Sequence, residues 1–439
     1  MDKFFETIGR GVAAAWWLWL PLWAGLLIAS MTWGPSWDEL SVEGQSNQMP
    51  DDAPTRRARR LAEEAFPGEN AESGVAVLAR RIDEPLTDAD GAFIAGPLAD
   101  RLQDAVDATD DGYPRVLLPF EFPRGDLQVS ADGRTAVVRV AFATPMFGAA
   151  AESRAAEVEE AVDRIRADAP AGVELFTTGS VMIGREFDRL ITDSTDAIQT
   201  YSLWVVLALL LAVFRAPLPT LVPLATMYIA VEVSMAAIGW AAAVGWLTLF
   251  DGLEVYTRVL AYGASVDDSV FLIARYREEL SAGHDPHAAT VRAIRGVGPA
   301  VTASAATEIV GIGMLTLAAF GKFFLAGIAI PAALFVTYLS AMTLTFGALR
   351  IAGRKAFWPR SIETTSDGPG VWSRIADRVV AKPAAYGGGL LLAMTPLAIW
   401  GAVRLDDVNY DLSSELPADS PAMAGLDALR DHFPDGIAG

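Results

Sequence analysis

The chain has 439 residues, of which 52% are hydrophobic, yet 54 acidic residues outnumber 34 basic ones and give a formal net charge of -20. One well-mixed soluble globule does not combine these values, so apolar blocks and acidic blocks are expected to be separate along the chain. The lack of cysteine excludes disulfide frameworks, zinc fingers and thiol nucleophiles, and the acidic balance argues against a nucleic-acid partner.

Seven apolar runs each approach the roughly 20 residues that a helix needs to cross the hydrocarbon core. They cover residues 11–33, 197–214, 218–240, 256–273, 299–320, 325–347 and 384–403. The first run predicts a retained span and not a cleaved signal peptide, because its 23 residues exceed the apolar core of a signal and include Trp16, Trp17, Trp19 and Trp23. The sequence therefore predicts a polytopic α-helical membrane protein.

The basic residues between the spans fall on one side, which the positive-inside rule assigns to the cytoplasm together with the N-terminus. The protein is accordingly expected in the cytoplasmic (inner) membrane. Residues 34–196 lie on the opposite side, and with 32 acidic and 16 basic residues this block carries -16 of the net charge.

Six parts follow along the chain. Residues 1–33 hold the first transmembrane helix, 34–196 an extracytoplasmic domain, 197–349 transmembrane helices two to six, 350–383 a cytoplasmic linker, 384–403 the seventh helix, and 404–439 the start of a second, truncated extracytoplasmic domain. The linker contains, at 371–380, a short amphipathic helix expected on the cytoplasmic face of the membrane.

The extracytoplasmic block has the pattern of an α+β domain. Strands are predicted at 75–82, 115–120 and 173–177, a strand pair at 127–144 with a turn at Asp132-Gly133, and helices at 93–108 and 152–167. The order is βαββαβ, a ferredoxin-like unit that makes one sheet with its helices on one face.

Ionisable residues within the spans are functional candidates, because burying a charge in the bilayer is costly. At 1.5 Å per residue, Asp267 lies about 12 Å inward from Arg275, and Glu308 lies about 13 Å inward from Pro299. Glu232 and Arg258 both lie about 25 Å from the cytoplasmic ends of their helices. Glu232 and Arg258 are therefore expected to form a structural ion pair.

Asp267, Asp268 and Glu308 have no basic residue of these spans at their depth. Such carboxyl groups are expected to exchange protons near physiological pH and to couple proton flow to helix motion. The alternative is that they only bond Ser, Thr or backbone groups, or face a wet cavity with no transport role.

Neighbouring helix residues point 100° apart, so Asp267 and Asp268 face different partners, one as the carrier and the other as its relay. Gly263 and Phe271 share the face of Asp267, and small residues precede Glu308, so close packing of spans four and five is expected. The pair His284 and His287 lacks the further ligands that a metal site needs.

The run Gly263-Ala-Ser-Val-Asp267-Asp268-Ser-Val-Phe271, followed by Ala274-Arg-Tyr-Arg-Glu-Glu-Leu280, resembles the fourth span of the MMPL branch of the resistance-nodulation-division (RND) superfamily. The resemblance implies an RND-type fold in which the acid relays protons during export of lipids or other hydrophobic cargo. Asp267 matches the acid of the family motif, and Asp268 stands where the family usually has tyrosine.

Weaker matches to the family occur in order at 66–68, 130–135, 178–179, 214–215, 416–420 and 433–434. Family members typically have twelve spans in two pseudo-repeats, whereas this chain stops after its seventh. The resemblance thus implies an N-terminal portion whose partners are protons, cargo, the membrane and the C-terminal half of the transporter. The sequence leaves self-association open.

Three functions are compatible with these features. The first is a proton-driven exporter that is not an enzyme and needs no cofactor; the absence of a G-x-x-x-x-G-K-[ST] motif argues against ATP hydrolysis. The second is a sterol-sensing or receptor-like regulator that binds lipid without net transport. The third is a protein-translocation auxiliary of the same superfamily.

Overall fold

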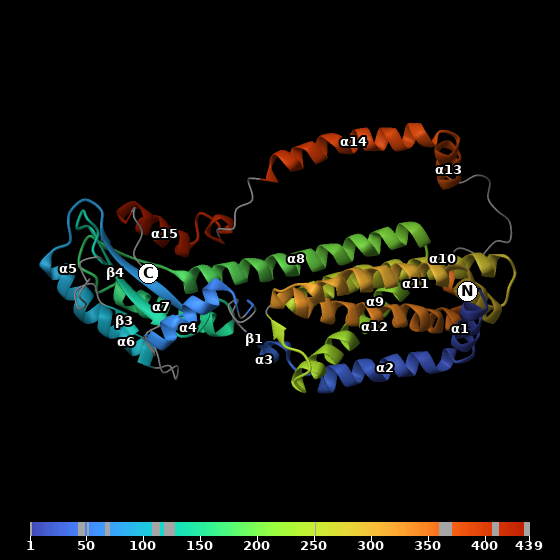
Figure 1. Cartoon of the computed structure of the whole chain (residues 1–439), viewed down its shortest axis with the longest axis horizontal. Helices are drawn as coiled ribbons and strands as arrows, with labels where there is room; N and C mark the ends of the chain where they lie inside the picture. The colour runs from blue at the N-terminus through green and yellow to red at the C-terminus, as the bar shows by residue number, and fades with distance from the viewer. Residues whose placement is uncertain are drawn as a thin grey trace.

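The structure is a computed structural model that describes residues 2–42, 49–50, 52–65, 71–107, 115–117, 128–250, 252–359, 371–405 and 412–433. A domain with a β-sheet lies at one end and a bundle of helices at the other (Figure 1). Helix α8 (Ser180–Phe214) begins beside the sheet and continues along the bundle, so it joins the two parts without a break.

The bundle is built from α9 (Pro217–Ala243), α10 (Leu253–Ser281), α11 (Pro286–Gly313) and α12 (Gly321–Ala352). Each of α9, α10 and α11 packs on α12, and α10 also packs on α9 and α11. The bundle has two apolar cores, one near each end: Leu272, Tyr276 and Phe346 belong to the first, and Leu249, Leu253 and Ile330 to the second.

Four helical segments among the described residues are long and apolar enough to cross a membrane. They are α9, α11 extended by the 3-10 turn η4 (Met314–Leu317), α12 extended by η5 (Gly353–Phe357), and α14 (Pro383–Val403). They coincide with four of the predicted spans. The predicted span at 197–214 is the shorter apolar end of α8, and the one at 256–273 lies in α10, whose charged residues lower its hydropathy.

The first predicted span, 11–33, is not one straight helix. The chain forms α1 (Asp2–Ala14) and α2 (Trp16–Trp33), which meet at 76°. The bend is fixed by side chains: Arg350 donates to the carbonyl of Ala13, and the Trp19 indole donates to the carbonyl of Val12 at 3.2 Å. Phe5 places α1 against α11. The first predicted span is therefore a bent pair of helices, whose second member begins at Trp16 and not at Gly11.

The chain leaves α2 at the end of the bundle nearest the sheet. Helix α3 (Trp37–Leu40) is fastened there by the Trp37 indole, which donates to the carbonyl of Met235 at 3.1 Å. The short strand β1 (Ser41–Val42) then pairs in parallel with β6 (Leu249–Phe250), in the connection between α9 and α10. Helix α4 (Pro54–Ala65) follows.

The sheet has four antiparallel strands in the order β3-β4-β2-β5. They are β2 (Ser73–Arg81), β3 (Arg115–Leu117), β4 (Thr135–Phe142) and β5 (Val173–Thr178). The predicted strand pair at 127–144 contains β4 and an isolated bridge between Val129 and Ala136. Residues 118–127, the motif at 66–68 and Pro434 lie outside the described residues.

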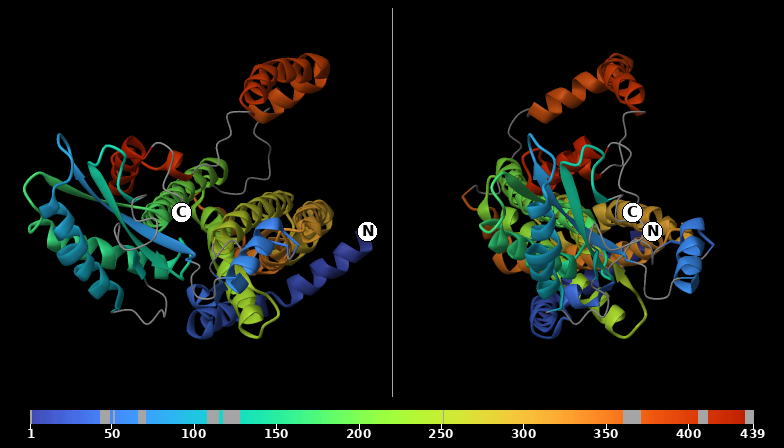
Figure 2. Two further views of the ribbon diagram at one scale, coloured as in Figure 1. Left: turned by 60° about the vertical axis from the view of Figure 1, so that its left-hand side comes forward. Right: turned by 90° about the vertical axis from the view of Figure 1, so that its left-hand side faces the viewer.

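Helices cover both faces of this sheet. On one face lie α5 (Asp88–Phe93), the π-helical turn η2 (Ile94–Leu98), α6 (Ala99–Asp107) and α7 (Ala149–Arg166), packed on inward side chains such as Val75, Val77 and Val138. On the other face, Leu78 and Val137 contact α15 (Pro421–His432). Figure 2 shows α15 in red beside the strands. Helix α15, which follows the seventh predicted span, thus packs on the same sheet as the residues before α8.

Between bundle and tail, α13 (Val371–Ala381) leads into α14, and η7 (Leu412–Glu415) precedes α15. None of the residues of α14 is buried, and Figure 1 draws this helix apart from the bundle. An apolar helix with a fully exposed surface needs either lipid or another protein segment around it.

Candidate functional site

The two adjacent acids of α10 lie in different environments. Asp268 is buried, with 8% of its surface exposed, whereas Asp267 is exposed on the outer face of the helix. This difference follows from the 100° step between successive helix residues. Asp268 faces the packed interior formed with α9 and α12, and Asp267 faces away from it.

Two buried hydroxyl residues flank Asp268. Ser265 lies one helical turn before it and Ser269 directly after it, and neither is exposed. The Ser269 hydroxyl is 3.4 Å from the Thr345 hydroxyl and joins α10 to α12. No hydrogen bond or ion pair joins the Asp268 carboxyl group to another described residue. The carboxyl group therefore lies in a small polar region of the bundle without a basic partner.

Glu308 of α11 lies near both acids of α10. The negative charges of Asp267 and Glu308 act on Asp268, and that of Asp267 acts on Glu308. Within the described part of the chain, no basic residue offsets the charge of Asp268 or Glu308. The structure thus brings together the three carboxyl groups that the depth estimate places at one level.

Gly263 and Phe271 share the face of Asp267, as predicted, but this face is open. Phe271 is 55% exposed, and no atom would lie within 4 Å of a Cβ at Gly263. Helices α10 and α11 are nevertheless in contact at other positions. Gly263 therefore contributes nothing to that contact in this chain.

Glu232 and Arg258 form an ion pair that joins α9 to α10. The distance from Arg258 Nη1 to Glu232 Oε1 is 2.6 Å, and Arg258 Nε lies 2.8 Å from Glu254 Oε1 on its own helix. Glu254, one turn before Arg258, is a third member of this ion pair, which equal depth along two helices does not indicate. Its i, i+4 spacing is the signal in the sequence that indicates it.

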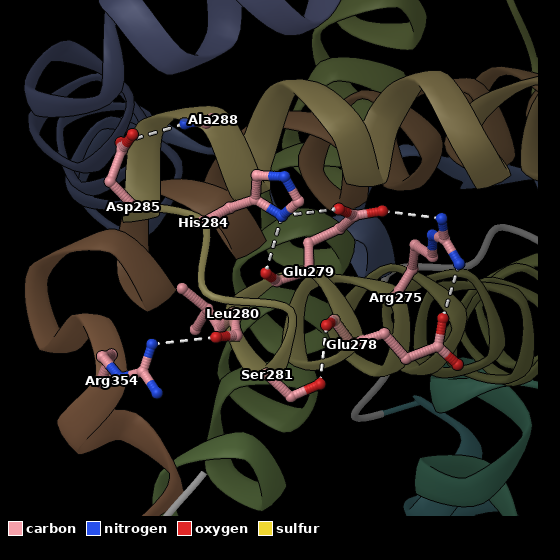
Figure 3. A network of polar contacts seen from close by, with 9 residues as sticks. All are labelled: Arg275, Glu278, Glu279, Leu280, Ser281, His284, Asp285, Ala288 and Arg354. Atoms are coloured by element: carbon pink, nitrogen blue, oxygen red, sulfur yellow. Dashed lines mark hydrogen bonds and ion pairs between the residues drawn. The ribbon is translucent and has the colours of Figure 1, made fainter. Parts of the chain in front are cut away.

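The far end of α10 is held by a polar network, shown in Figure 3. Arg275 contacts both Glu278 and Glu279 at 2.7 Å, and the His284 ring lies 3.2 Å from the Glu279 carboxylate. Asp285 caps the first turn of α11 by accepting from the backbone of His287 and Ala288. The His284 ring and the backbone of His287 thus order the turn between the helices.

Comparison with known proteins places this architecture in one family. The sequence model of the MMPL family matches residues 47–386. The putative membrane protein ActII-3 of Streptomyces coelicolor is 28% identical over 425 residues, which cover 96% of this chain and 57% of that protein. The acyltrehalose exporter MmpL10 of Mycobacterium tuberculosis is 28% identical over 94% of this chain and 40% of its own length.

A third relative is the apo-petrobactin exporter of Bacillus anthracis, 28% identical over 286 residues, which cover 61% of this chain and 38% of the exporter. The chain spans about half the length of the curated relatives that it matches.

Proposed function

The chain belongs to the MMPL family, and on that premise we propose that it forms part of a proton-driven exporter of lipidic or other hydrophobic cargo. Relatives named as an acyltrehalose exporter and an apo-petrobactin exporter support the transport of such molecules. The proposal places the protein in the cytoplasmic membrane, with its N-terminus in the cytoplasm.

The observation that carries the proposal is the cluster of Asp267, Asp268 and Glu308. A negative charge on buried Asp268, beside those of Asp267 and Glu308 and with no basic residue near it among the described residues, raises the free energy of a closely packed bundle. Binding of a proton removes a charge and lowers that free energy. Protonation therefore favours one packing of the helices and deprotonation another, which is the coupling that a proton-driven transporter requires.

The burial of the acids suggests a division of roles. Asp268, inside the bundle, is the group whose protonation changes the packing of α10 against α9 and α12. Asp267 and Glu308, on the exposed face, are placed to exchange protons with a segment that covers this face. We propose that the covering segment is the C-terminal half of the transporter, because the relatives are about twice as long as this chain.

The sheet domain supplies the route for cargo in this proposal. Its strand order, β3-β4-β2-β5, and its β-α-β-β-α-β succession support a ferredoxin-like porter domain outside the membrane. Helix α8 runs without interruption from this domain into the bundle. A tilt of α8 that follows protonation of Asp268 would thus move the porter domain as well.

The test is cargo movement by the full-length protein in proteoliposomes, with an acylated trehalose as the probe and a pH gradient as the driving force. We expect the movement to stop when a protonophore collapses the gradient, and in the Asp267→Asn, Asp268→Asn double variant. Glu278→Gln is the matched control, because Glu278 is an exposed acid of the same helix that already pairs with Arg275. Movement that persists with the protonophore or in the double variant would contradict the proposal.

A further inference from the structure

Two hydroxyl groups on the buried face of α10 have no hydrogen-bond partner in the described part of the protein. They belong to Ser265 and Tyr276, whose side chains are fully buried. Buried hydroxyl groups in proteins are almost always hydrogen-bonded, to protein or to ordered water. Both groups therefore point to buried water molecules in the bundle.

Other hydroxyl groups of the bundle show that Ser265 is an exception. Thr257 of the same helix donates to the carbonyl of Leu253 at 2.7 Å, and Ser234 of α9 donates to that of Ala230 at 2.6 Å. A serine in a helix is normally satisfied in this way by its own backbone. Ser265 makes no such bond, so its hydroxyl group is free to bind a molecule beside Asp268.

Tyr276 shows the same contrast with Tyr338. The Tyr338 hydroxyl lies 2.8 Å from the Thr302 hydroxyl, so it is satisfied between α12 and α11. The Tyr276 ring packs edge-on against Phe346, with centroids 6.0 Å apart, inside an apolar core. Its hydroxyl group has no hydrogen-bond partner among the described residues, although the charges of Arg350 and Asp285 act on it.

The unpartnered groups lie on both sides of Asp268 along the helix. Ser265, Ser269 and Tyr276 follow each other at spacings of four and seven residues, so they share one face of α10. Long side chains in helices lean toward the N-terminus, so the Tyr276 ring leans toward the level of the Ser269 and Thr345 pair. Asp268 thus has the Ser265 hydroxyl on the side of the sheet domain. The hydroxyl groups of Ser269, Thr345 and Tyr276 lie on the side of the opposite end of the helix.

We propose that Ser265 and Tyr276 each bind a buried water molecule, and that these waters and hydroxyl groups form the proton path to and from Asp268. The inference rests on the proposed function, because it requires that Asp268 exchanges protons. Each hydroxyl group or water on the path accepts one proton and releases another, so only Asp268 changes its charge. Tyr276 connects Asp268 to the cytoplasmic end of α10, and Ser265 connects it to the side of the sheet domain.

The rate of proton exchange tests the path. The full-length protein is reconstituted in one orientation, the pH is changed on the cytoplasmic side, and the infrared C=O band of protonated Asp268 is followed in time. The band is identified by its loss in Asp268→Asn. We expect Tyr276→Phe to slow its appearance by about tenfold or more, because proton transfer through a positioned group is lost. Tyr338→Phe, which also removes one tyrosine hydroxyl, should leave the rate unchanged.

A pH change on the side of the membrane that carries the sheet domain tests Ser265 in the same way. Ser265→Ala is the variant and Ser234→Ala is its control. The waters themselves are detected independently in the wild-type protein by O–H stretching bands that shift in H₂¹⁸O. One such band should disappear in Tyr276→Phe and another in Ser265→Ala. This measurement needs no transport and keeps the test valid if a variant loses activity for another reason.

The outcomes separate the two proposals. If the Asp268 band responds to pH at the wild-type rate in both variants, or if no isotope-sensitive band is lost, the path is wrong while Asp268 remains a proton carrier. If Asp268 in the wild type shows no C=O band at any pH, the proposed proton coupling fails.

Discussion

The imidazole ring of His432 lies 2.8 Å from a carboxylate oxygen of Asp132, although 300 residues separate them. This contact is at one end of the interface between α15 and the sheet. At the other end, the Thr178 hydroxyl donates to the carbonyl of Ala422 at 2.9 Å. A segment that follows α14 is thereby fixed to the domain that precedes α8, so a displacement of either helix acts on the same sheet.

Docking of α15 on the sheet should weaken at acidic pH. Burial raises the pKa of Asp132, but hydrogen bonds from the Ser130 hydroxyl, the Arg134 amide and His432 outweigh it and lower the pKa to about 2. Of these partners only His432 belongs to α15, so its share of the lowering stabilises the docked state, and this share is lost as pH falls from about 4 toward 2. Fluorescence of a dye on a single cysteine in α15 should report release in this window. In Asp132→Asn that pH dependence should disappear; a transition that persists there would show that another group controls docking.

Close packing of α15 on β5 depends on Gly425. A Cβ at this position would lie 2.6 Å from the carbonyl oxygen of Thr177, which is part of the strand backbone and cannot move aside. Gly425→Ala should therefore displace α15 and destabilise the domain by about 1–3 kcal/mol. The measurement is thermal unfolding together with the rate of tryptic cleavage at Arg430.

Gly387→Ala is the control for this variant, because a Cβ at Gly387 in α14 has no neighbour within 4 Å. Equal stability of Gly425→Ala and the wild type would mean that α15 does not pack on the sheet in solution.

A second ion pair stabilises the opposite face of the sheet domain. Asp90 is fully buried and accepts from Arg81 at 2.7 Å and from the backbone and hydroxyl of Thr87. The hydrogen bond from Arg81 contributes most to lowering the pKa of Asp90 to about 2, with burial opposing it. The free energy of unfolding of the domain should thus decrease as the pH is lowered from about 4 to about 2.

Asp90→Asn should cost about 2 kcal/mol at neutral pH, because it replaces charge-assisted hydrogen bonds by neutral ones. It should also flatten the acid dependence of thermal unfolding. Asp88→Asn, at a neighbouring exposed acid in the same helix, is the control.

Much of this architecture could be predicted from local pattern. Apolar runs predict the helices of the bundle, and alternation predicts β2 and β5 to within two residues at each end. Equal depth along two helices brings Glu232 to Arg258, because a helix has a fixed rise and an unpaired charge in the bilayer is costly. These predictions need only the geometry of a single helix or strand, or of two straight helices side by side.

What escaped prediction depends on contacts between distant segments. The 100° step shows that Asp267 and Asp268 face apart but not which one is buried, because that is decided by the packing of α9 and α12. The bend after Ala14 depends on Arg350, and the position of α15 depends on the far face of the sheet. The sequence pattern of a single apolar or amphipathic run does not indicate which distant segment will pack against it.

The ion pair of α9 and α10 should behave as a structural unit. Arg258→Gln leaves Glu232 and Glu254 near each other without a counter-charge, so it should destabilise the protein by about 3 kcal/mol. Replacing Glu232 by Gln in the same molecule removes part of that penalty and should restore stability, which a double-mutant cycle in thermal unfolding measures. Additive losses from the two changes would show that the residues do not interact.

The two acids of α10 should differ in their effect on stability, and this difference tests the structure of the site directly. Asp268 is buried without a basic partner, so its ionised form destabilises the packed bundle, and Asp268→Asn should stabilise the chain in alkaline buffer by about 1–2 kcal/mol. Asp267 is exposed on the open face, so Asp267→Asn should change the stability of this chain by less than about 0.5 kcal/mol.

In the full-length protein, where the proposed C-terminal half covers that face, Asp267→Asn should also become stabilising, because covering Asp267 gives it the environment that Asp268 already has. Thermal unfolding of both variants in both forms of the protein measures the four values. If Asp267→Asn and Asp268→Asn shift the unfolding of this chain equally, the two carboxyl groups share one environment and the assignment of Asp268 as the inner group is wrong.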